Sequence, residues 1–377
     1  MLPVVALHGD GIGPEILEVA LAVLEAAASA AGVRLDVRRY PAGATVAATA
    51  GVPVTNEAVE ACGAVGIVLK SPTGIPVRRG ADGTEIGMAS GYLRARLGLW
   101  ANIRPVRRPP GTPAPVAGAI DCVIVRENTE GIYASRGRGI RTADVAVDLI
   151  VVTRRATDRL ARLAAALALA RRAARGDRPD ERAARVTCVD KANVLGSFAF
   201  FREVARAAVT ATPNVAFEAM HADAAAAALV QRPQAFDVML AENLVGDILS
   251  DLAGAVAGGI GLCPSANLGH GVAMFEPIHG SAPDLAGTGR ANPLGQVLSA
   301  AMLLEWAGES SAGALIEEAV DAALADGALH VEPDGTLREG PERAGLILPE
   351  FLRQRAGAPR PLRPLLLPLS SATCPLG

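Results

Sequence analysis

The sequence predicts an α/β protein built on a mostly parallel sheet. First, short apolar runs alternate with stretches of helical periodicity, which is the pattern of strands joined by crossover helices. Second, half of the 377 residues are hydrophobic but only 3% are aromatic, so a large core of Ala, Val, Leu and Ile is expected. Third, a chain of this length is too long to fold around one simple core, so two lobes or domains are expected.

The elements are expected in the following order. An apolar run at residues 4–7 precedes a glycine-rich loop, and residues 15–31 have helical spacing, so the chain begins as strand, loop and helix. Residues 107–115 are rich in Pro and mark a connector. Residues 154–175 combine Ala and Arg at helical spacing, which favours a solvated amphipathic helix over a nucleic-acid-binding arm. Residues 35–39 are expected to form the next strand, and buried strands are expected at residues 64–69, 120–125, 186–189 and 236–240.

Composition excludes several classes of function. The chain has 36 Lys and Arg against 39 Asp and Glu, so no net field attracts nucleic acid or an anionic membrane. Its five cysteines are scattered and form no CxxC pair, which favours a reducing, cytoplasmic environment over disulfides. The opening MLPVVALHGDG is typical of a strand rather than a signal peptide, and no segment has the apolar length of a membrane span.

The glycine loop HGDGIGPE at residues 8–15 invites a dinucleotide-binding interpretation. A Rossmann fingerprint needs GxGxxG, in which the third glycine packs the helix against the strand. Counting from Gly9, the third position is Pro14, and counting from Gly11 it is Ile16. Neither register matches, and Pro14 suits the first turn of a helix. A plain structural turn explains the same residues.

Two acids in ENLVGDILSD, residues 242–251, are the strongest candidates for a metal site. Asp247 and Asp251 are four residues apart and would share one helix face, where like charges repel. A divalent cation would remove that repulsion, and hard oxygen ligands suit Mg²⁺ or Mn²⁺. Alternatively, the two acids lie near the N-terminus of a helix, where the helix dipole favours negative charge without a metal. Asp223, just before an Ala-rich stretch, has the position of an N-cap residue when considered alone.

Three arginines are candidates for binding carboxylates. Arg94 and Arg104 flank LGLWAN, and Arg126 follows an apolar strand directly. An arginine at the carboxyl end of a strand points into the crevice where α/β proteins bind ligands, and its guanidinium can grip a carboxylate bidentately. Together they would suit a di- or tricarboxylate, whereas each alone is also compatible with a surface ion pair.

Together these stretches resemble the isocitrate/isopropylmalate dehydrogenase family, the β-decarboxylating 2-hydroxyacid dehydrogenases. The resemblance extends from residue 8 to residue 306. Besides HGDGIGPEI and GRANPLGQVLSAAMLLEW at its two ends, it is carried by LRARLGLWANIRP (93–105), VRENTEGIY (125–133), DKANV (190–194), ENLVGDILSD (242–251) and FEPIHGSAPDLAG (275–287).

The resemblance implies a two-domain α/β fold of the isopropylmalate dehydrogenase type, which is not a Rossmann fold. One domain would comprise residues 1–100 and 253–355 on the cofactor side, and residues 101–252 would form the central domain, with the site in the cleft between them. Residues 356–377, rich in Pro and Leu near the end, are expected to be a poorly ordered tail. The resemblance also implies a homodimer with shared active sites.

The resemblance assigns roles to individual residues. Arg94, Arg104 and Arg126 would hold the substrate carboxylates. Tyr133 would protonate the product's enol carbon, and Lys191 of the neighbouring subunit would assist deprotonation of the substrate hydroxyl. Metal and lysine would lower the pKa of that hydroxyl for hydride transfer to NAD⁺, and the metal would then stabilise the enolate left by CO₂.

The metal and cofactor residues follow from the same motifs. Asp247 and Asp251 would bind Mg²⁺ or Mn²⁺, with Asp223 supplied by the partner chain. Asp284 matches the family's NAD-type position, where a carboxylate accepts the ribose hydroxyls and repels a 2′-phosphate. The other residues expected at the dinucleotide are Asn193, near the nicotinamide, and Glu276, His279, Gly280, Ser281, Ala282 and Asn292.

The stretch before Arg94 departs from the family pattern. Isopropylmalate enzymes resemble one another in carrying two leucines there, whereas this chain has Ser90 and Gly91, which leave a larger, more polar space for the substrate's side group. Homoisocitrate types carry an arginine where Gly91 stands, and residues 70–72 (KSP) also depart from the usual Gly-rich turn. We expect 3-isopropylmalate or a related alkylmalate first, with isocitrate, homoisocitrate, tartrate and D-malate as alternatives.

Two other classes of function remain as alternatives. A non-catalytic regulatory subunit should have lost the acids, the lysine or the tyrosine, all of which this chain keeps. A simple Rossmann reductase would work without a divalent metal, so insensitivity to EDTA would favour it.

Overall fold

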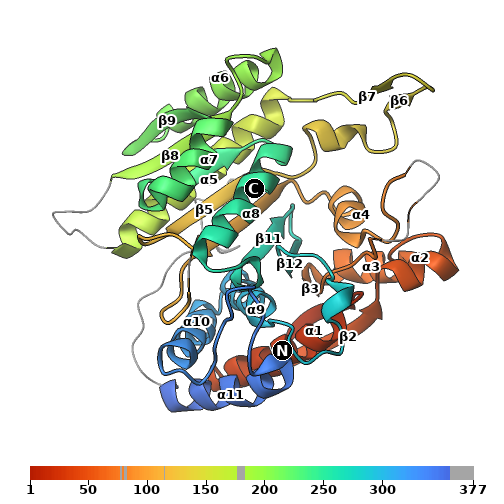
Figure 1. Ribbon diagram of the computed structural model, residues 1–377, viewed down its shortest axis with the longest axis vertical. Helices are drawn as coiled ribbons and strands as arrows, with labels where there is room; N and C mark the ends of the chain where they lie inside the picture. The colour runs from red at the N-terminus through yellow and green to blue at the C-terminus, as the bar shows by residue number, and fades with distance from the viewer. Residues whose placement is uncertain (77–78, 80–82, 114, 176–182, 357–377) are drawn as a thin grey trace.

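One mixed sheet organises the molecule. The computed structural model describes residues 1–76, 79, 83–113, 115–175 and 183–356 (Figure 1). Within these residues the large sheet has ten strands in the order β2-β1-β3-β12-β11-β4-β5-β10-β8-β9. The strands are β1 (Leu2–His8), β2 (Leu35–Pro41), β3 (Ile67–Lys70), β4 (Ala101–Arg107), β5 (Asp121–Glu127), β8 (Ala184–Asp190), β9 (Val215–His221), β10 (Val238–Ala241), β11 (Pro264–Leu268) and β12 (Ala273–Pro277).

The sheet is parallel at both ends and antiparallel in the middle. Strand β11 pairs antiparallel with β12 and β4, and β4 pairs antiparallel with β5. The other neighbours are parallel, so the predicted mostly parallel sheet is confirmed. A separate two-stranded arm, β6 (Ile140–Arg141) with β7 (Ala146–Val147), projects from the body (Figure 1).

Helices cover the sheet. The first part of the chain contributes α1 (Gly13–Ala30), α2 (Ala44–Ala50), α3 (Asn56–Val65) and α4 (Ala89–Arg96). The middle contributes α5 (Arg154–Arg175), α6 (Gly196–Thr210), α7 (Ala222–Gln231) and α8 (Asn243–Ala257). The last helices are α9 (Leu294–Trp306), α10 (Ser310–Ala325) and α11 (Gly340–Arg355), and the short 3₁₀ helices are η1 (Ile132–Ser135), η2 (Pro233–Ala235), η3 (Ile260–Leu262) and η4 (Pro283–Leu285).

Local sequence explains where the main elements begin and end. Pro14 lies in the first turn of α1, as predicted, because its missing N–H costs nothing there. The strand expected at residues 64–69 begins only at Ile67, because Thr55 caps α3 and Gly66 ends it in the left-handed conformation. His221 holds the N-cap position of α7, so the N-cap interpretation of Asp223 was wrong by two residues, and Asp223 lies in the first turn of the helix.

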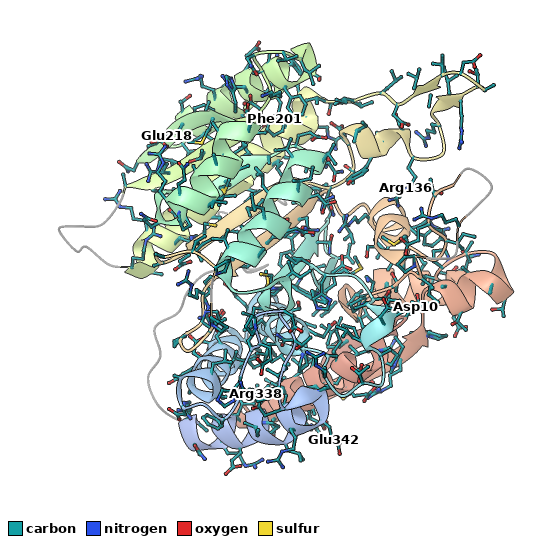
Figure 2. The ribbon with its side chains drawn as sticks, in the orientation of Figure 1. Asp10, Arg136, Phe201, Glu218, Arg338 and Glu342 are labelled. Carbon is teal, nitrogen blue, oxygen red and sulfur yellow. The ribbon has the colours of Figure 1, made fainter. Side chains whose placement is uncertain are left out.

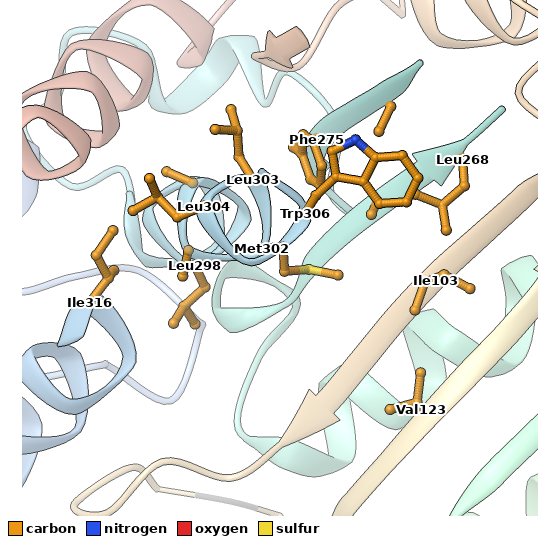
Figure 3. Packing of buried hydrophobic residues seen from close by; sticks show 14 of the residues in the cluster. Ile103, Val123, Leu268, Phe275, Leu298, Met302, Leu303, Leu304, Trp306 and Ile316 are labelled. Atoms are coloured by element: carbon orange, nitrogen blue, oxygen red, sulfur yellow. The ribbon is translucent and has the colours of Figure 1, made fainter. Parts of the chain in front are cut away.

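The core lies where α9 crosses the sheet. Helix α9 is apolar on nearly all sides, and it is buried between the sheet and the helices α1 and α10. Figure 3 shows Trp306 of α9 beside Phe275 of β12, with Leu268 and Ile103 of the neighbouring strands close by. The same buried cluster continues to α5, so it joins both groups of residues that were predicted to be separate domains. The domain boundaries themselves stay a prediction.

Three further expectations concern the whole chain. Among the described residues, no helix combines the length and the apolarity needed to cross a bilayer. Cys62, Cys122, Cys188 and Cys263 are buried and free, as expected from their spacing. The tail predicted to be poorly ordered lies, from residue 357 on, outside the described residues.

Candidate active site

A cavity of about 580 Å³ brings together most of the residues predicted to bind the substrate and the metal. Its lining comes from both predicted domains: α4 and the end of β12 on one side, and β4, β5, η1 and α8 on the other. The predicted residues that line it are Ser90, Gly91, Arg94, Arg104, Arg126, Tyr133, Asp247, Asp251, Glu276, His279 and Gly280.

The three arginines are held by neighbouring polar groups before any ligand binds. Arg126 lies at the carboxyl end of β5, as predicted, and donates to Asn243 Oδ1 at 2.7 and 3.0 Å and to Asp247. Arg104 of β4 donates to Ser250 Oγ at 2.7 Å. Burial, followed by the charges of Arg104 and Arg94, lowers the pKa of Arg126 to about 9. An anion placed among these guanidinium groups would therefore be stabilised.

Asp247 and Asp251 lie one turn apart on α8, which confirms that they share a helix face. Burial opposes ionisation of Asp247, but the charges of Arg126, Arg104 and Arg94 outweigh it and lower the Asp247 pKa. Burial raises the pKa of Asp251, with a contribution from Asp247. Carboxylate oxygens on one face suit Mg²⁺ or Mn²⁺. Within the described part of one chain, however, no group of three metal-binding side chains forms.

Tyr133 stands at the mouth of the same cavity. It belongs to η1, and its hydroxyl donates to Asp247 Oδ2 at 3.0 Å. The Arg126 guanidinium lies 5.7 Å from the centre of its ring. Burial and the Asp247 carboxylate raise the Tyr133 pKa, so the phenol keeps its proton at neutral pH. The group is placed to give a proton to a molecule held by the arginines.

Lys191, Asn193 and Asp223 lie elsewhere and do not line this cavity. The Lys191 ammonium pairs with Asp223 Oδ2 at 2.8 Å, and the Asp223 side chain is 70% exposed. Asn193 is exposed in the turn between β8 and α6. One chain therefore does not join these three residues to Tyr133 and Asp247.

A second cavity, of about 860 Å³, adjoins the first, because His279 and Gly280 line both. Ala282 and Asn292, which were expected at the dinucleotide, line this cavity, and Asp284 is exposed in η4 beside Leu285 of its lining. The Nε2 atom of His279 is buried and has no hydrogen-bond partner among the described residues. An unpaired polar atom at the junction of the two cavities fits a site whose ligand is polar.

Two predicted cofactor residues are occupied by other contacts. Ser281 is buried and donates to the Gly74 carbonyl oxygen. Glu276 is buried and pairs with Lys70 Nζ at 2.8 Å, while Ser90 Oγ donates to it at 2.8 Å. The sequence showed Lys70 only as a departure from the family pattern, and nothing local in the sequence indicated its partner.

Comparisons with known proteins identify the family of this chain. The sequence model described as isocitrate/isopropylmalate dehydrogenase matches residues 3–333. The 3-isopropylmalate dehydrogenase of Salinibacter ruber is 41% identical over 330 residues, which cover 84% of this chain and 86% of that protein. The isocitrate/homoisocitrate dehydrogenase of Thermus thermophilus is 40% identical over 324 residues, covering 85% of this chain and 90% of that protein.

Solved structures show the same relationship. The crystal structure of isocitrate dehydrogenase from Methylococcus capsulatus matches with a TM-score of 0.82 at 36% identity, covering 94% of this chain and 100% of that chain. Sequence and fold thus point to one family. The chain belongs to the isocitrate/isopropylmalate dehydrogenase family of enzymes.

Proposed function

We propose that the protein catalyses the NAD-dependent, Mg²⁺- or Mn²⁺-assisted oxidative decarboxylation of a 3-substituted malate. The observation that carries this proposal is the convergence of Arg94, Arg104 and Arg126 with the α8 carboxylates and Tyr133 in one cavity. The adjoining 860 Å³ cavity has the size range of a small-molecule or cofactor site. Several relatives bear the name 3-isopropylmalate dehydrogenase, which is consistent with 3-isopropylmalate as the first candidate substrate.

The chain's own residues account for binding and proton transfer. The three arginines would hold the two carboxylates of the malate core and orient C2 towards His279 and the second cavity. When bound, NAD⁺ would accept the hydride from C2, and the divalent cation would stabilise the negative charge that develops as CO₂ leaves. Tyr133, whose phenol stays protonated, would then deliver a proton to the enol carbon.

The remaining groups would come from a second copy of the chain. Lys191 would take the proton of the C2 hydroxyl, and Asp223 would complete the metal ligands. Lys191 is partly exposed and Asp223 is exposed. Large apolar side chains are exposed at Val194 (68%), three residues after Lys191, at Ile248 of α8 (59%), and at Ile140 (67%) and Leu149 (66%). A homodimer with shared sites would remove such apolar side chains from water where they lie in the interface.

The test is a screen for NADH formation with Mn²⁺ over 3-isopropylmalate, isocitrate, homoisocitrate, tartrate and D-malate. We expect NADH and CO₂ in equal amounts with a 3-substituted malate, loss of activity with EDTA, and preference for NAD⁺ over NADP⁺ because of Asp284. Activity that survives EDTA, or oxidation without release of CO₂, would contradict the proposal.

A further inference from the structure

The guanidinium of Arg136 occupies the place that a side chain at position 91 would take. An ideal Cβ built on Gly91 of α4 would lie 2.2 Å from Nη1 of Arg136 and 3.2 Å from its Cζ. Arg136 itself comes from the loop after η1, and in Figure 2 it lies above α4. Both residues line the 580 Å³ cavity. A positively charged group from another element therefore lies where a side chain at position 91 would begin.

Arg136 differs from Arg94, Arg104 and Arg126 in having no carboxylate partner among the described residues. Arg94, Arg104 and Arg126 each pair with a carboxylate of Glu276, Asp247 or Asp251. The exposed side chain of Arg136 forms no hydrogen bond or ion pair with any other described residue. Its planar N–H donors are therefore available to a ligand.

The charged residues that line the cavity also favour an anionic ligand. Its acidic lining residues are Asp247, Asp251 and Glu276, and its basic ones are Lys70, Arg94, Arg104, Arg126, Arg136 and Arg138. Glu276 is shared by Lys70 and Arg94, and the two α8 carboxylates face Arg104 and Arg126. The loop arginines thus add positive charge that no carboxylate of the described chain offsets, and this charge favours a ligand with more negative charge than malate.

We propose that Arg136 recognises a carboxylate on the 3-substituent of the substrate, so that the enzyme prefers 2-hydroxy tricarboxylates to 3-alkylmalates. This inference rests on the proposed function, which supplies the malate core of the substrate. It adds the chemical class of the group at C3. A guanidinium offers a carboxylate two parallel hydrogen bonds, whereas an isopropyl group would bury against it without satisfying its N–H groups. Ser90 offers little to either substituent because its hydroxyl is directed to Glu276.

The experiment compares kcat/KM for isocitrate and homoisocitrate with kcat/KM for 3-isopropylmalate, using the full chain with Mn²⁺. We expect the native protein to prefer a tricarboxylate, and Arg136→Leu to lower that preference by about 10- to 100-fold, since a hydrogen bond to a charged group is lost. Gly91→Leu should shift the preference in the same direction, because its side chain would displace the guanidinium. Arg96→Leu is the matched control, since Arg96 is an exposed arginine of α4 that contacts Tyr92 and Asn56 outside the cavity.

A binding measurement separates this inference from the proposed function. Calorimetric titration with isocitrate and 3-isopropylmalate in the presence of Mn²⁺ reports the same preference without turnover. If isocitrate binds more tightly and this depends on Arg136, but no NADH forms, the role of Arg136 is supported and the proposed function is contradicted. Preference of the native protein for 3-isopropylmalate, or an unchanged ratio in Arg136→Leu, would overturn the assignment even if oxidative decarboxylation is observed.

Discussion

Lys70 and Glu276 form the most buried ion pair at the site. The Lys70 side chain is inaccessible, and its Nζ lies 2.8 Å from Glu276 Oε2. Burial by itself would raise the Glu276 pKa, but the charges of Lys70 and Arg94 lower it to about 2. Glu276 also accepts from Asn267 Nδ2 at 2.9 Å. The carboxylate stays ionised at neutral pH and holds Arg94 towards the cavity.

Replacing Lys70 by Met should destabilise the protein by roughly 3–5 kcal/mol, because it removes a partner of a buried charge. Since the Glu276 pKa lies below its ordinary value of 4.5, the stability that this group contributes is present above about pH 4.5 and is lost as the pH falls towards 2. In Lys70→Met the Glu276 pKa rises, so acid unfolding should begin at higher pH. Urea unfolding measured from pH 7 to pH 3 checks both effects.

The matched control is Asp36→Asn, which removes an exposed pair with Arg38 and should change little. Equal acid sensitivity of Lys70→Met and the native protein would show that Lys70 does not set the ionisation of Glu276.

At Asp251 we expect Asp251→Asn to weaken Mn²⁺ binding by at least about tenfold, because one of two hard ligands on α8 loses its charge. Because the Asp251 pKa is raised, a proton competes with the metal for this carboxylate. The Mn²⁺ affinity of the native protein should therefore fall as the pH is lowered. Calorimetric Mn²⁺ titration measures both. Asp158→Asn on α5 serves as the control, because the exposed Asp158 carboxylate pairs with Arg162. Equal Mn²⁺ affinities of the two variants would show that Asp251 does not bind the metal.

At the scale of elements, the start of α8 holds Tyr133 and Asp247 at a fixed distance from each other. Glu242 is the N-cap of α8 and accepts from the amides of Leu244 at 3.0 Å and Val245 at 3.3 Å. The same side chain accepts from the Ile132 amide of η1 at 3.3 Å. Because Tyr133 follows Ile132 and Asp247 lies one turn into α8, this cap sets the distance between them.

Glu242→Ala should cost about 1–2 kcal/mol of stability through the lost cap and should lower kcat more than it raises KM, since Tyr133 loses its orientation. Glu242→Gln keeps an acceptor oxygen, and burial already raises the Glu242 pKa, so this variant should recover most of both losses. Denaturant unfolding and steady-state kinetics measure the effects. If Ala and Gln variants have the same kcat, the cap does not position Tyr133.

At the scale of the whole molecule, a single chain leaves Lys191 and Asp223 away from the cavity that contains Tyr133 and Asp247. The Lys191–Asp223 pair supplies two groups of the proposed chemistry, and neither residue lines the cavity that contains the three arginines. A two-fold dimer would bring each pair to the cavity of the other copy, since a two-fold interface repeats every contact in both directions.

Mixing two inactive variants tests this arrangement. Lys191→Met and Tyr133→Phe should each be inactive alone, whereas the mixed dimer would have one intact site formed by Tyr133 of one copy and Lys191 of the other. After random exchange of subunits, activity should return to about one quarter of the native value. NADH formation after co-refolding measures it. No recovery, despite mixed dimers detected by mass spectrometry, would place Lys191 in the site of its own chain.

The sequence by itself determined the features that depend on near neighbours along the chain. The spacing of Asp247 and Asp251, Arg126 at a strand end and Pro14 in a first helical turn were all predicted and confirmed. The ordered motifs also identified the family. These features follow from helix periodicity, capping and strand ends, which act over a few residues.

Only the tertiary structure decided which distant side chains meet. It placed Lys70 against Glu276, and it set Arg136 over Gly91, where the sequence alone predicted an open, polar space. It also left Lys191 and Asp223 outside the cavity of their own chain. Such contacts depend on strand register and on the approach of elements far apart in sequence, and a local pattern does not encode them because the partner's position is set by the packing of the whole core.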